Sequence, residues 1–294
     1  MLPFRRIDLL ILAFPLLLDA QTVRRRAVAR PAVVPRVSHV FLVVLENTDR
    51  DVAVSLPFMQ RLAAAGAVLT NYRGVAHPSQ PNYIAMTAGS TDGVNGDVSV
   101  TLDVPHIGDL LEQKGLTWKA YAENYPVDCF LGDTNGTIEQ GQYVRRHEPF
   151  IEFLDVQRDP DRCRTHIVNA NVLDADIVTG ALPNFSFYSP DNQHNGHDSS
   201  AAAADAWLEQ RFGPLLKDQR FVSDMLFIVT WDESRSQLHN DVLTVMTGPS
   251  VKPGVASAVS YDHYNLLRTI EAIFATGTLG QHDRDATPVT GIWR

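Results

Sequence analysis

One run of residues limits what this chain can fold into more than any other: the apolar segment 40–45, followed directly by Glu46 and Asn47. A continuous apolar run that is rich in β-branched side chains and bounded by polar residues is typical of a strand buried on both faces, as in a parallel sheet. Open α/β sheets bind ligands beyond the carboxyl ends of such strands. The pattern therefore predicts a buried strand that leads into a ligand site. A strand ending in a solvated Glu-Asn turn is the alternative on these residues alone.

The same pattern returns late in the chain, where the apolar residues 225–231 run into the adjacent carboxylates Asp232 and Glu233. Further strands are predicted over 68–75, 117–123, 184–188 and 241–247, and helices over 57–66, 79–89, 107–114, 199–216 and 263–275. Strands that alternate with helices predict one α/β domain with a largely parallel sheet. Residues 126–175 are predicted to be an irregular excursion from that sheet, and residues 276–294 a loose tail.

The first 36 residues are predicted to lie outside this domain, which would span 37–294. Residues 1–20 combine early arginines with a short apolar stretch, the layout of a secretory signal peptide, and the stretch is too short to span a bilayer. A tail that is not cleaved is the alternative. Residues 21–36 hold five arginines, two prolines and no acid, which predicts a linker. This linker could touch anionic lipid, although a solvated spacer is favoured. The expected location is secreted or periplasmic.

The charge of the predicted domain argues against nucleic acid as a partner. Residues 37–294 contain 18 basic and 32 acidic residues, a net charge of −14 with histidine neutral. Such a surface repels a polyanion, and no basic stripe with interleaved aromatic residues is present.

The two cysteines, Cys129 and Cys163, bear on the compartment. An even number in an exported protein indicates one disulfide. Two free buried thiols are the alternative. A metal site built on them is poorly supported, because neither lies in a C-x-x-C motif.

Ser79 lies in the segment His77-Pro78-Ser79-Gln80-Pro81-Asn82-Tyr83. Prolines are tolerated in the first turn of a helix, so Ser79 is predicted at the N-terminus of the helix that ends near Gly89. Backbone N–H groups at such a terminus bind phosphate and favour an alkoxide. Taken alone, however, a plain N-cap serine is the favoured interpretation.

Three other segments contain histidines that could take part in a site. The segment after the predicted strand 184–188 packs two histidines and two aspartates into eight residues, a dense supply of metal ligands and proton carriers. His263 is predicted to start the last helix. Residues 143–150 bring His147 together with Arg145 and Arg146, and a solvated turn is favoured there on the residues alone.

Taken together, the polar residues at strand ends and helix starts predict one shared cation site. Carboxylates packed close together are unfavourable unless a cation offsets them, and a serine beside that cation is an activated nucleophile. The chain has no G-x-S-x-G, Walker A or G-x-G-x-x-G motif, which disfavours the folds that those motifs mark. The residues concerned are Glu46, Asn47, Ser79, His194, His197, Asp198, Asp232, Glu233 and His263.

At these residues the chain resembles the phosphoesterase family that includes secreted acid phosphatases and phospholipases C, a branch of the alkaline phosphatase superfamily. The resemblance covers about residues 38 to 275 and implies an alkaline phosphatase-like α/β fold, a three-layer sandwich with a largely parallel central sheet. Eight short segments match in the family's order: 43–47, 77–83, 118–123, 147–150, 182–186, 196–198, 229–233 and 262–264.

The resemblance also implies a role for each residue. Ser79 takes the place of the nucleophile, with His197 and His263 as catalytic histidines. Glu46, Asn47, Asp232 and Glu233 match metal ligands. His194, Asp198, Asn82 and His147 are expected on the substrate side of the site. Many members of the superfamily have Asp-His where this chain has Asp232-Glu233, and the richer supply of oxygen suits Mg²⁺, Mn²⁺ or Ca²⁺ better than Zn²⁺ alone.

The sequence thus predicts a secreted, metal-dependent phosphoesterase. An acid phosphatase that hydrolyses small-molecule or lipid phosphate monoesters through a phosphoserine intermediate is favoured. One alternative is a phospholipase C or other phosphodiesterase that uses the same site. The other is an exported metal-binding protein without activity. The sequence does not indicate an oligomeric state.

Overall fold

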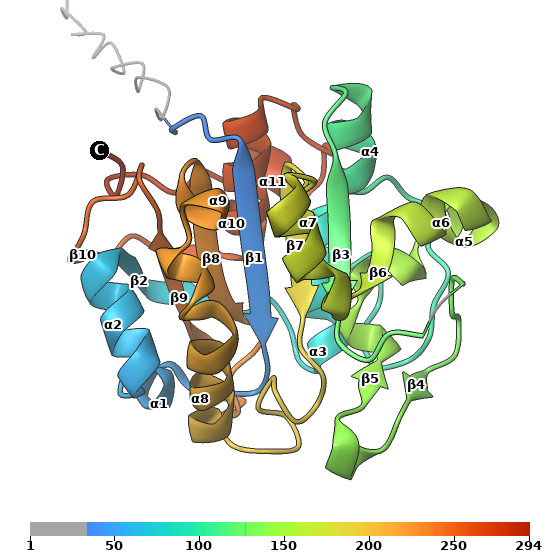
Figure 1. The fold of residues 1–294 in the computed structure, drawn as a ribbon, viewed down its shortest axis with the longest axis horizontal. Coiled ribbons are helices and arrows are strands. Elements are labelled where there is room, and N and C mark those ends of the chain that lie inside the picture. Colours follow the sequence, from blue (N-terminus) through green and yellow to red (C-terminus); the bar gives the residue numbers. More distant parts are fainter. Residues whose placement is uncertain (1–33, 127) are drawn as a thin grey trace, which may run out of the picture. The chain divides into compact units, whose positions relative to one another are not determined.

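A computed structural model describes residues 34–126 and 128–294 (Figure 1). The predicted signal peptide and most of the predicted linker lie outside the described residues. None of the helices that the structure describes is long and apolar enough to cross a membrane.

The centre of the fold is a nine-stranded sheet. Only β9 is antiparallel to its neighbours, β2 and β8, and every other strand pair in this sheet is parallel. The predicted, largely parallel sheet is therefore confirmed. In spatial order the strands are β10 (Val255–Ser257), β2 (Ala67–Arg73), β9 (Asp241–Thr247), β8 (Met225–Trp231), β1 (His39–Leu45), β7 (Phe185–Ser189), β3 (Trp118–Ala122) and β6 (Ile167–Asn169), and β11 (Tyr261–Asp262) pairs with β2.

Strand β1 lies in the middle of the sheet, between β7 and β8. Residues 40–45 are all buried, as the unbroken apolar run predicts. The ring of Phe41 alone meets five other aromatic rings at centroid distances of 5.3 to 6.2 Å. Such pairs add about 0.5–1.5 kcal/mol each beyond the burial of apolar area. The rings belong to Tyr121, Tyr188, Phe212, Phe221 and Phe227.

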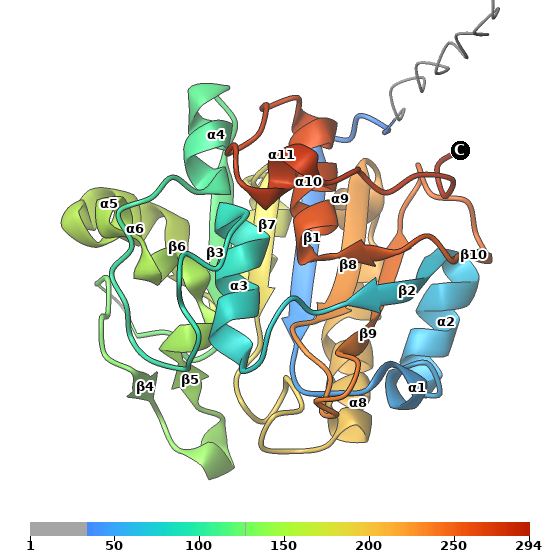
Figure 2. The ribbon, with the colours of Figure 1, turned by 180° about the vertical axis from the view of Figure 1, so that it is seen from behind.

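Helices cover both faces of the sheet, which confirms the three-layer architecture (Figures 1 and 2). The face in front in Figure 1 carries α2 (Pro57–Ala65) with α1 (Arg50–Ala53) beside it, α7 (Leu173–Thr179), α8 (Ala201–Phe212) and α9 (Gln219–Val222). The opposite face carries α3 (Ser79–Ala88), α4 (Ile107–Gln113), α10 (His263–Phe274) and α11 (His282–Asp285). Every residue of α3 is buried, so this short helix is enclosed by the domain.

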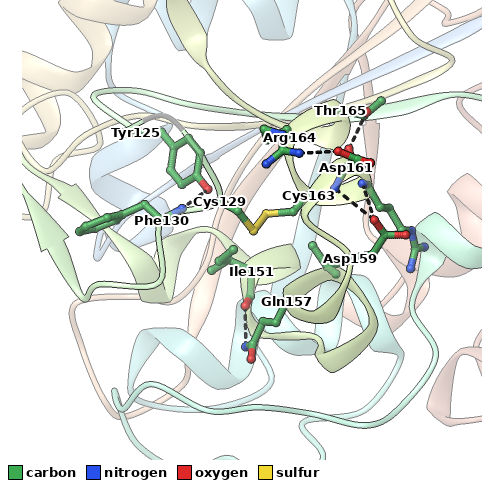
Figure 3. The surroundings of a disulfide bond; sticks show 12 residues. Tyr125, Cys129, Phe130, Ile151, Gln157, Asp159, Asp161, Cys163, Arg164 and Thr165 are labelled. Carbon is green, nitrogen blue, oxygen red and sulfur yellow. Dashed lines mark hydrogen bonds and ion pairs between the residues drawn. A yellow bond between two sulfur atoms is a disulfide. The ribbon is translucent and has the colours of Figure 1, made fainter.

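The segment 126–175 is more regular than expected. It contains the hairpin β4 (Thr134–Asn135) and β5 (Tyr143–Val144), helices α5 (Leu154–Arg158) and α6 (Pro160–His166), and strand β6, which joins the main sheet beside β3. The prediction of an irregular excursion was wrong at β6, because three residues are too few to show a strand period. The predicted disulfide between Cys129 and Cys163 is present within this segment (Figure 3).

We expect loss of this disulfide to lower stability measurably. It closes a loop of 34 residues, which corresponds to about 3–4 kcal/mol of unfolded-state entropy. For a domain of this size, the replacement Cys129→Ser should lower the melting temperature by about 5–10 °C in thermal denaturation followed by circular dichroism. A reducing agent should lower the melting temperature of the wild type to the same value and leave the variant unchanged. Equal melting temperatures for variant and oxidised wild type would contradict the expectation.

The C-terminal tail is packed rather than loose, so that prediction was wrong. Val289 and Ile292 are fully buried, Trp293 pairs with Val251 in a β-bridge, and the short helix α11 lies within the same stretch. The residues that pack are spaced irregularly, so neither helical nor strand periodicity reveals them.

Candidate active site

Two carboxyl ends of the parallel sheet meet at the candidate site. Strands β1 and β8 are parallel neighbours in which Leu45 pairs with Trp231, so Glu46 and Asp232 follow at the same level. The Asp232 N–H group donates to the Leu45 carbonyl oxygen over 3.0 Å and extends the pairing by one residue. Adjacent strands lie about 4.8 Å apart, which places both carboxylates at one edge of the sheet.

Ser79 is the first residue of α3 and reaches this edge from the face of the sheet that α3 covers (Figure 2). Its Oγ lies 2.9 Å from Glu46 Oε2 and 3.3 Å from Glu233 Oε1. The serine is 2% exposed and does not cap its own helix. The interpretation as a plain N-cap residue therefore does not describe this structure: the hydroxyl faces carboxylates that follow two different strands.

Asn82 holds the loop that presents Ser79. Its Oδ1 accepts hydrogen bonds from the N–H groups of Val75 and Ala76 over 2.8 and 3.0 Å, and its Nδ2 donates to the carbonyl oxygens of Ala76 and Pro78. The side chain is fully buried. The structure thus gives Asn82 a positioning role rather than the contact with substrate that the resemblance implies.

The three carboxylates are electrostatically unfavourable as they stand. Glu46 and Asp232 are fully buried and Glu233 is 5% exposed. Burial, and then the charge of Asp232, raises the pKa of Glu46 well above its ordinary value. Burial together with Glu233 raises the pKa of Asp232 to about 8, and burial together with Glu46 raises the pKa of Glu233 to about 8. Without a compensating charge the cluster therefore resists ionisation at neutral pH.

The cluster offers oxygen atoms that could bind a divalent cation. Asp232 Oδ1 accepts the Asn47 N–H group over 3.2 Å, whereas Asp232 Oδ2 is buried without a hydrogen-bond partner among the described residues. Asn47 has a φ of 46°, a left-handed conformation that asparagine tolerates well, and its amide lies 3.4 Å from Glu46 Oε2. Oxygen atoms dominate the set, which suits a hard cation. The structure thus brings together Ser79 and the four predicted ligands, whose binding of metal stays a prediction.

Tyr83 and His147 both lie against the Glu46 carboxylate. Tyr83 OH donates to Glu46 Oε1 over 2.5 Å, and His147 Nε2 lies 3.3 Å from the same oxygen. The His147 ring stacks on Tyr83 at 5.4 Å. Burial, and then the charge of Arg146, lowers the pKa of His147 well below its ordinary value. The solvated turn favoured for residues 143–150 is therefore wrong: His147 is buried, and Arg145 is paired with Glu152.

Sequence reasoning missed two residues of the site, Tyr83 and His77. Tyr83 lies four residues after Ser79 in a helix, a spacing that places both on one face and could have revealed it. His77 Nδ1 is hydrogen-bonded to Glu233 Oε2, and its Nε2 is buried without a hydrogen-bond partner among the described residues. Its position two residues before Ser79 was the available signal.

His197 and Asp198 form a hydrogen-bonded pair beside the cluster. His197 Nδ1 lies 2.7 Å from Asp198 Oδ1, and Asn192 donates to the other oxygen of Asp198 over 2.8 Å. The His197 ring lies 5.9 Å from that of His147, and its charge acts on Glu46. Because Asp198 bonds Nδ1, the other nitrogen of His197 is the one available to a substrate.

His263 lies behind the cluster. Its Nε2 donates to the Asp232 carbonyl oxygen over 2.6 Å, and its Nδ1 accepts the Tyr72 hydroxyl over 3.0 Å. Burial lowers the pKa of His263 to about 4. With both nitrogens bonded within the protein, this imidazole positions Asp232. The arrangement does not support the expected role in protonating a leaving group.

His194 lies in a different cluster from Ser79, contrary to the expectation that it lines the substrate site. Its Nδ1 lies 2.6 Å from Glu123 Oε2, and its ring stacks on Trp207 of α8. Strand pairing explains the separation. Val40 of β1 and Trp118 of β3 both pair with Phe185 of β7. Glu46 follows Val40 by an even number of residues, whereas Glu123 follows Trp118 by an odd number. Their side chains therefore point to opposite faces of the sheet.

The sequence of this chain is similar to those of known proteins. The sequence profile of the Phosphoesterase family matches residues 52–276, well over half of the chain. The chain belongs to this family. The predicted family is thereby confirmed.

Among curated relatives, this chain is 34% identical over 254 residues to a probable acid phosphatase of Kluyveromyces lactis, covering 84% of this chain and 60% of the relative. It is 32% identical over 269 residues to a phosphatidylinositol-3-phosphatase of Mycobacterium tuberculosis, covering 88% of this chain and 84% of that protein. The chain spans less than two thirds of the length of the fungal acid phosphatases that it matches.

The fold of this chain is similar to that of solved structures. A protein of the alkaline phosphatase superfamily from Vibrio parahaemolyticus superposes with a TM-score of 0.58 and 13% identity, over 88% of this chain and 72% of that one. At this identity the likeness concerns the fold alone, and it confirms the predicted alkaline phosphatase-like architecture.

Proposed function

We propose that this protein hydrolyses phosphate monoesters through a phosphoseryl intermediate on Ser79. One observation carries the proposal: the Ser79 hydroxyl, at the start of the buried helix α3, lies within hydrogen-bond distance of both Glu46 Oε2 and Glu233 Oε1. Carboxylates with strongly raised pKa values cluster at functional sites, so three of them around one buried serine favour a catalytic role over a structural one.

Ser79 Oγ attacks phosphorus in line with the leaving oxygen, so the Oγ–P bond forms as the P–O bond to the alcohol breaks. Glu46 Oε2, at 2.9 Å, is the nearest acceptor for the hydroxyl proton. Glu46, Asn47, Asp232 and Glu233 would hold a divalent cation, which neutralises charge and polarises the phosphoryl oxygens. The Tyr83 hydroxyl holds the Glu46 carboxylate by a hydrogen bond, His147 lies 3.3 Å from the same oxygen, and His263 bonds the backbone carbonyl of Asp232.

The leaving alcohol needs a proton, and His197 is placed to supply it. Asp198 bonds Nδ1 and thereby favours a proton on that nitrogen, so a charged imidazole can donate from Nε2. After the alcohol departs, neutral His197 can take a proton from the water that attacks the phosphoserine. Phosphate leaves as the Oγ–P bond breaks, and Ser79 Oγ regains its proton from Glu46.

Small phosphate monoesters and lipid phosphate monoesters are the two candidate substrate classes. The acid phosphatase relatives support small phosphate monoesters. A lipid phosphate monoester is the second candidate, because the match to the Mycobacterium tuberculosis phosphatidylinositol-3-phosphatase extends over most of both chains, whereas the fungal relatives are much longer. A phosphodiesterase activity stays an alternative that the turnover experiment below distinguishes.

Export is part of the same proposal. The disulfide between Cys129 and Cys163 persists in an oxidising compartment, which agrees with the signal peptide predicted over residues 1–20. N-terminal sequencing of the protein recovered from its producing cells and medium tests this. A mature protein beginning after residue 20 supports export, and an intact Met1 in protein confined to the cytoplasm contradicts it.

Turnover of p-nitrophenyl phosphate and bis-p-nitrophenyl phosphate by the purified protein tests the function. Faster release of nitrophenol from the monoester, abolished by EDTA and restored by Mg²⁺, Mn²⁺, Ca²⁺ or Zn²⁺, is expected. Faster diester turnover would favour the phosphodiesterase alternative. No turnover of either ester with any of these metals would contradict the proposed function and favour a binding protein.

A further inference from the structure

Two adjacent arginines beside the site have very different partners. Arg145 is 7% exposed and fully engaged: it donates to the carbonyl oxygens of Leu131 and Val100 over 2.6 and 3.0 Å and pairs with Glu152 at 2.8 Å. The next residue, Arg146, has a side chain that is 25% exposed, and its one ion-pair partner among the described residues is Asp97, with Nε 3.5 Å from Oδ2. Arg146 Nε is nevertheless buried and makes no hydrogen bond there.

A guanidinium with so few partners is unusual at this level of burial. It carries five N–H donors, and a buried donor without an acceptor costs about 1–3 kcal/mol. Arg145 shows that the fold can satisfy an arginine at the neighbouring position. A ligand that supplies acceptor oxygens would satisfy Arg146 in the same way.

Asp97 ties Arg146 to the nucleophile. Asp97 Oδ1 accepts the N–H group of Gln80, the residue after Ser79, over 3.0 Å. The Asp97–Arg146 pair therefore lies against the first turn of α3, next to Ser79.

Arg146 is also close to the residues around Glu46. It directly precedes His147, whose Nε2 lies 3.3 Å from Glu46 Oε1, and the Tyr83 hydroxyl donates to the same oxygen. The guanidinium is thus a partly exposed cation beside the start of α3, next in the chain to a residue that contacts Glu46. A dianionic substrate entering the site would otherwise meet Glu46, Asp232 and Glu233.

We propose that Arg146 binds the non-bridging phosphoryl oxygens of the substrate and makes the site select phosphate monoester dianions over diester monoanions, with Asp97 as its positioning residue. This inference rests on the proposed function. The planar fork of arginine matches two oxygens of one phosphoryl group, and a monoester offers one more anionic oxygen than a diester.

The test compares Arg146→Ala and Arg146→Lys with the wild type at a pH well above the second phosphate pKa of about 6, where the monoester is a dianion. For Arg146→Ala we expect kcat/KM to fall about 10- to 100-fold with p-nitrophenyl phosphate, and several-fold less with the diester. Arg146→Lys should retain an intermediate preference, because lysine keeps the charge but not the fork.

Two more variants complete the design. Asp97→Asn keeps an acceptor for the Gln80 N–H group but weakens the hold on Arg146, so KM for the monoester should rise more than kcat falls. Arg61→Ala is the matched control: Arg61 pairs with Glu209 on the opposite face of the sheet, and its loss should change neither ester's kinetics. Thermal denaturation of each variant establishes that it is folded.

Binding of inorganic phosphate, measured by calorimetry in the presence of the activating metal, separates this inference from the proposed function. Arg146→Ala should weaken phosphate binding at least about tenfold even if the wild type turned over neither ester. Equal losses for monoester and diester, or unchanged phosphate affinity in a folded Arg146→Ala protein, would overturn the role of Arg146 and leave the role of Ser79 standing.

Discussion

Replacing Ser79 by alanine is expected to lower kcat for phosphate monoesters by about 10⁴-fold or more, the size of loss seen when a covalent nucleophile is removed. The change removes the atom that bonds to phosphorus, while Glu46, Asp232 and Glu233 remain. Helix α3 should persist, because the serine makes no capping hydrogen bond. Initial rates of nitrophenol release, together with the melting temperature, measure both effects.

The intermediate itself gives a second readout. Wild-type protein quenched in acid during turnover should carry one phosphoryl group on the peptide that contains Ser79, and the alanine variant should carry none. Ser186→Ala is a matched control, because Ser186 is also a buried serine, and its Oγ has no hydrogen-bond partner among the described residues. Near-wild-type turnover by the Ser79→Ala protein, or a phosphoryl group on another residue, would show that Ser79 is not the nucleophile.

The residues that the sequence located best are those that follow strands. Glu46 comes directly after β1 and Asp232 after β8, and the rule that parallel strands end at one edge brings them together without further information. Ser79 was located by a helix start that its neighbouring prolines marked. In each case a local pattern fixes the element, and the topology of the sheet fixes the meeting point.

The roles of the imidazoles could not be predicted in this way. His263 was correctly placed at the start of a helix, but its partners Tyr72 and Asp232 lie 191 and 31 residues away in the chain. His194 is only three residues from His197, yet His194 pairs with Glu123 and His197 with Asp198. Spacing in sequence shows that such groups are available, whereas their partners depend on side-chain packing across elements.

The second large effect concerns Asp232, whose replacement by asparagine is expected to lower metal-dependent turnover at least about 100-fold. The variant keeps the shape of the side chain and an acceptor for the Asn47 N–H group, but it loses the charge that a cation would meet at Oδ2. Added metal should restore the activity of the EDTA-treated wild type and not that of the variant.

The same carboxylate should set how stability depends on pH in the metal-free protein. Burial, then Glu233, raises the pKa of Asp232 to about 8, so the folded state keeps a proton that the unfolded chain loses near pH 4. Unfolding then releases a proton between these values, and the free energy of unfolding falls as the pH rises from about 4 to about 8. Asp232→Asn should therefore flatten the decline in melting temperature across this range in EDTA.

Glu271 provides the matched control, since burial and then Asp283 raise its pKa to about 9 and it belongs to α10, outside the carboxylate cluster. Glu271→Gln should also flatten the pH dependence of stability, but it should leave metal-dependent turnover intact.

Metal should raise the melting temperature of the wild type more at pH 8 than at pH 5, because protons compete with the cation at low pH. A metal-induced rise that survives in Asp232→Asn would place the cation elsewhere. A variant that loses activity but keeps the full pH dependence would show that Asp232 is ionised without metal, contrary to the electrostatics of three buried carboxylates.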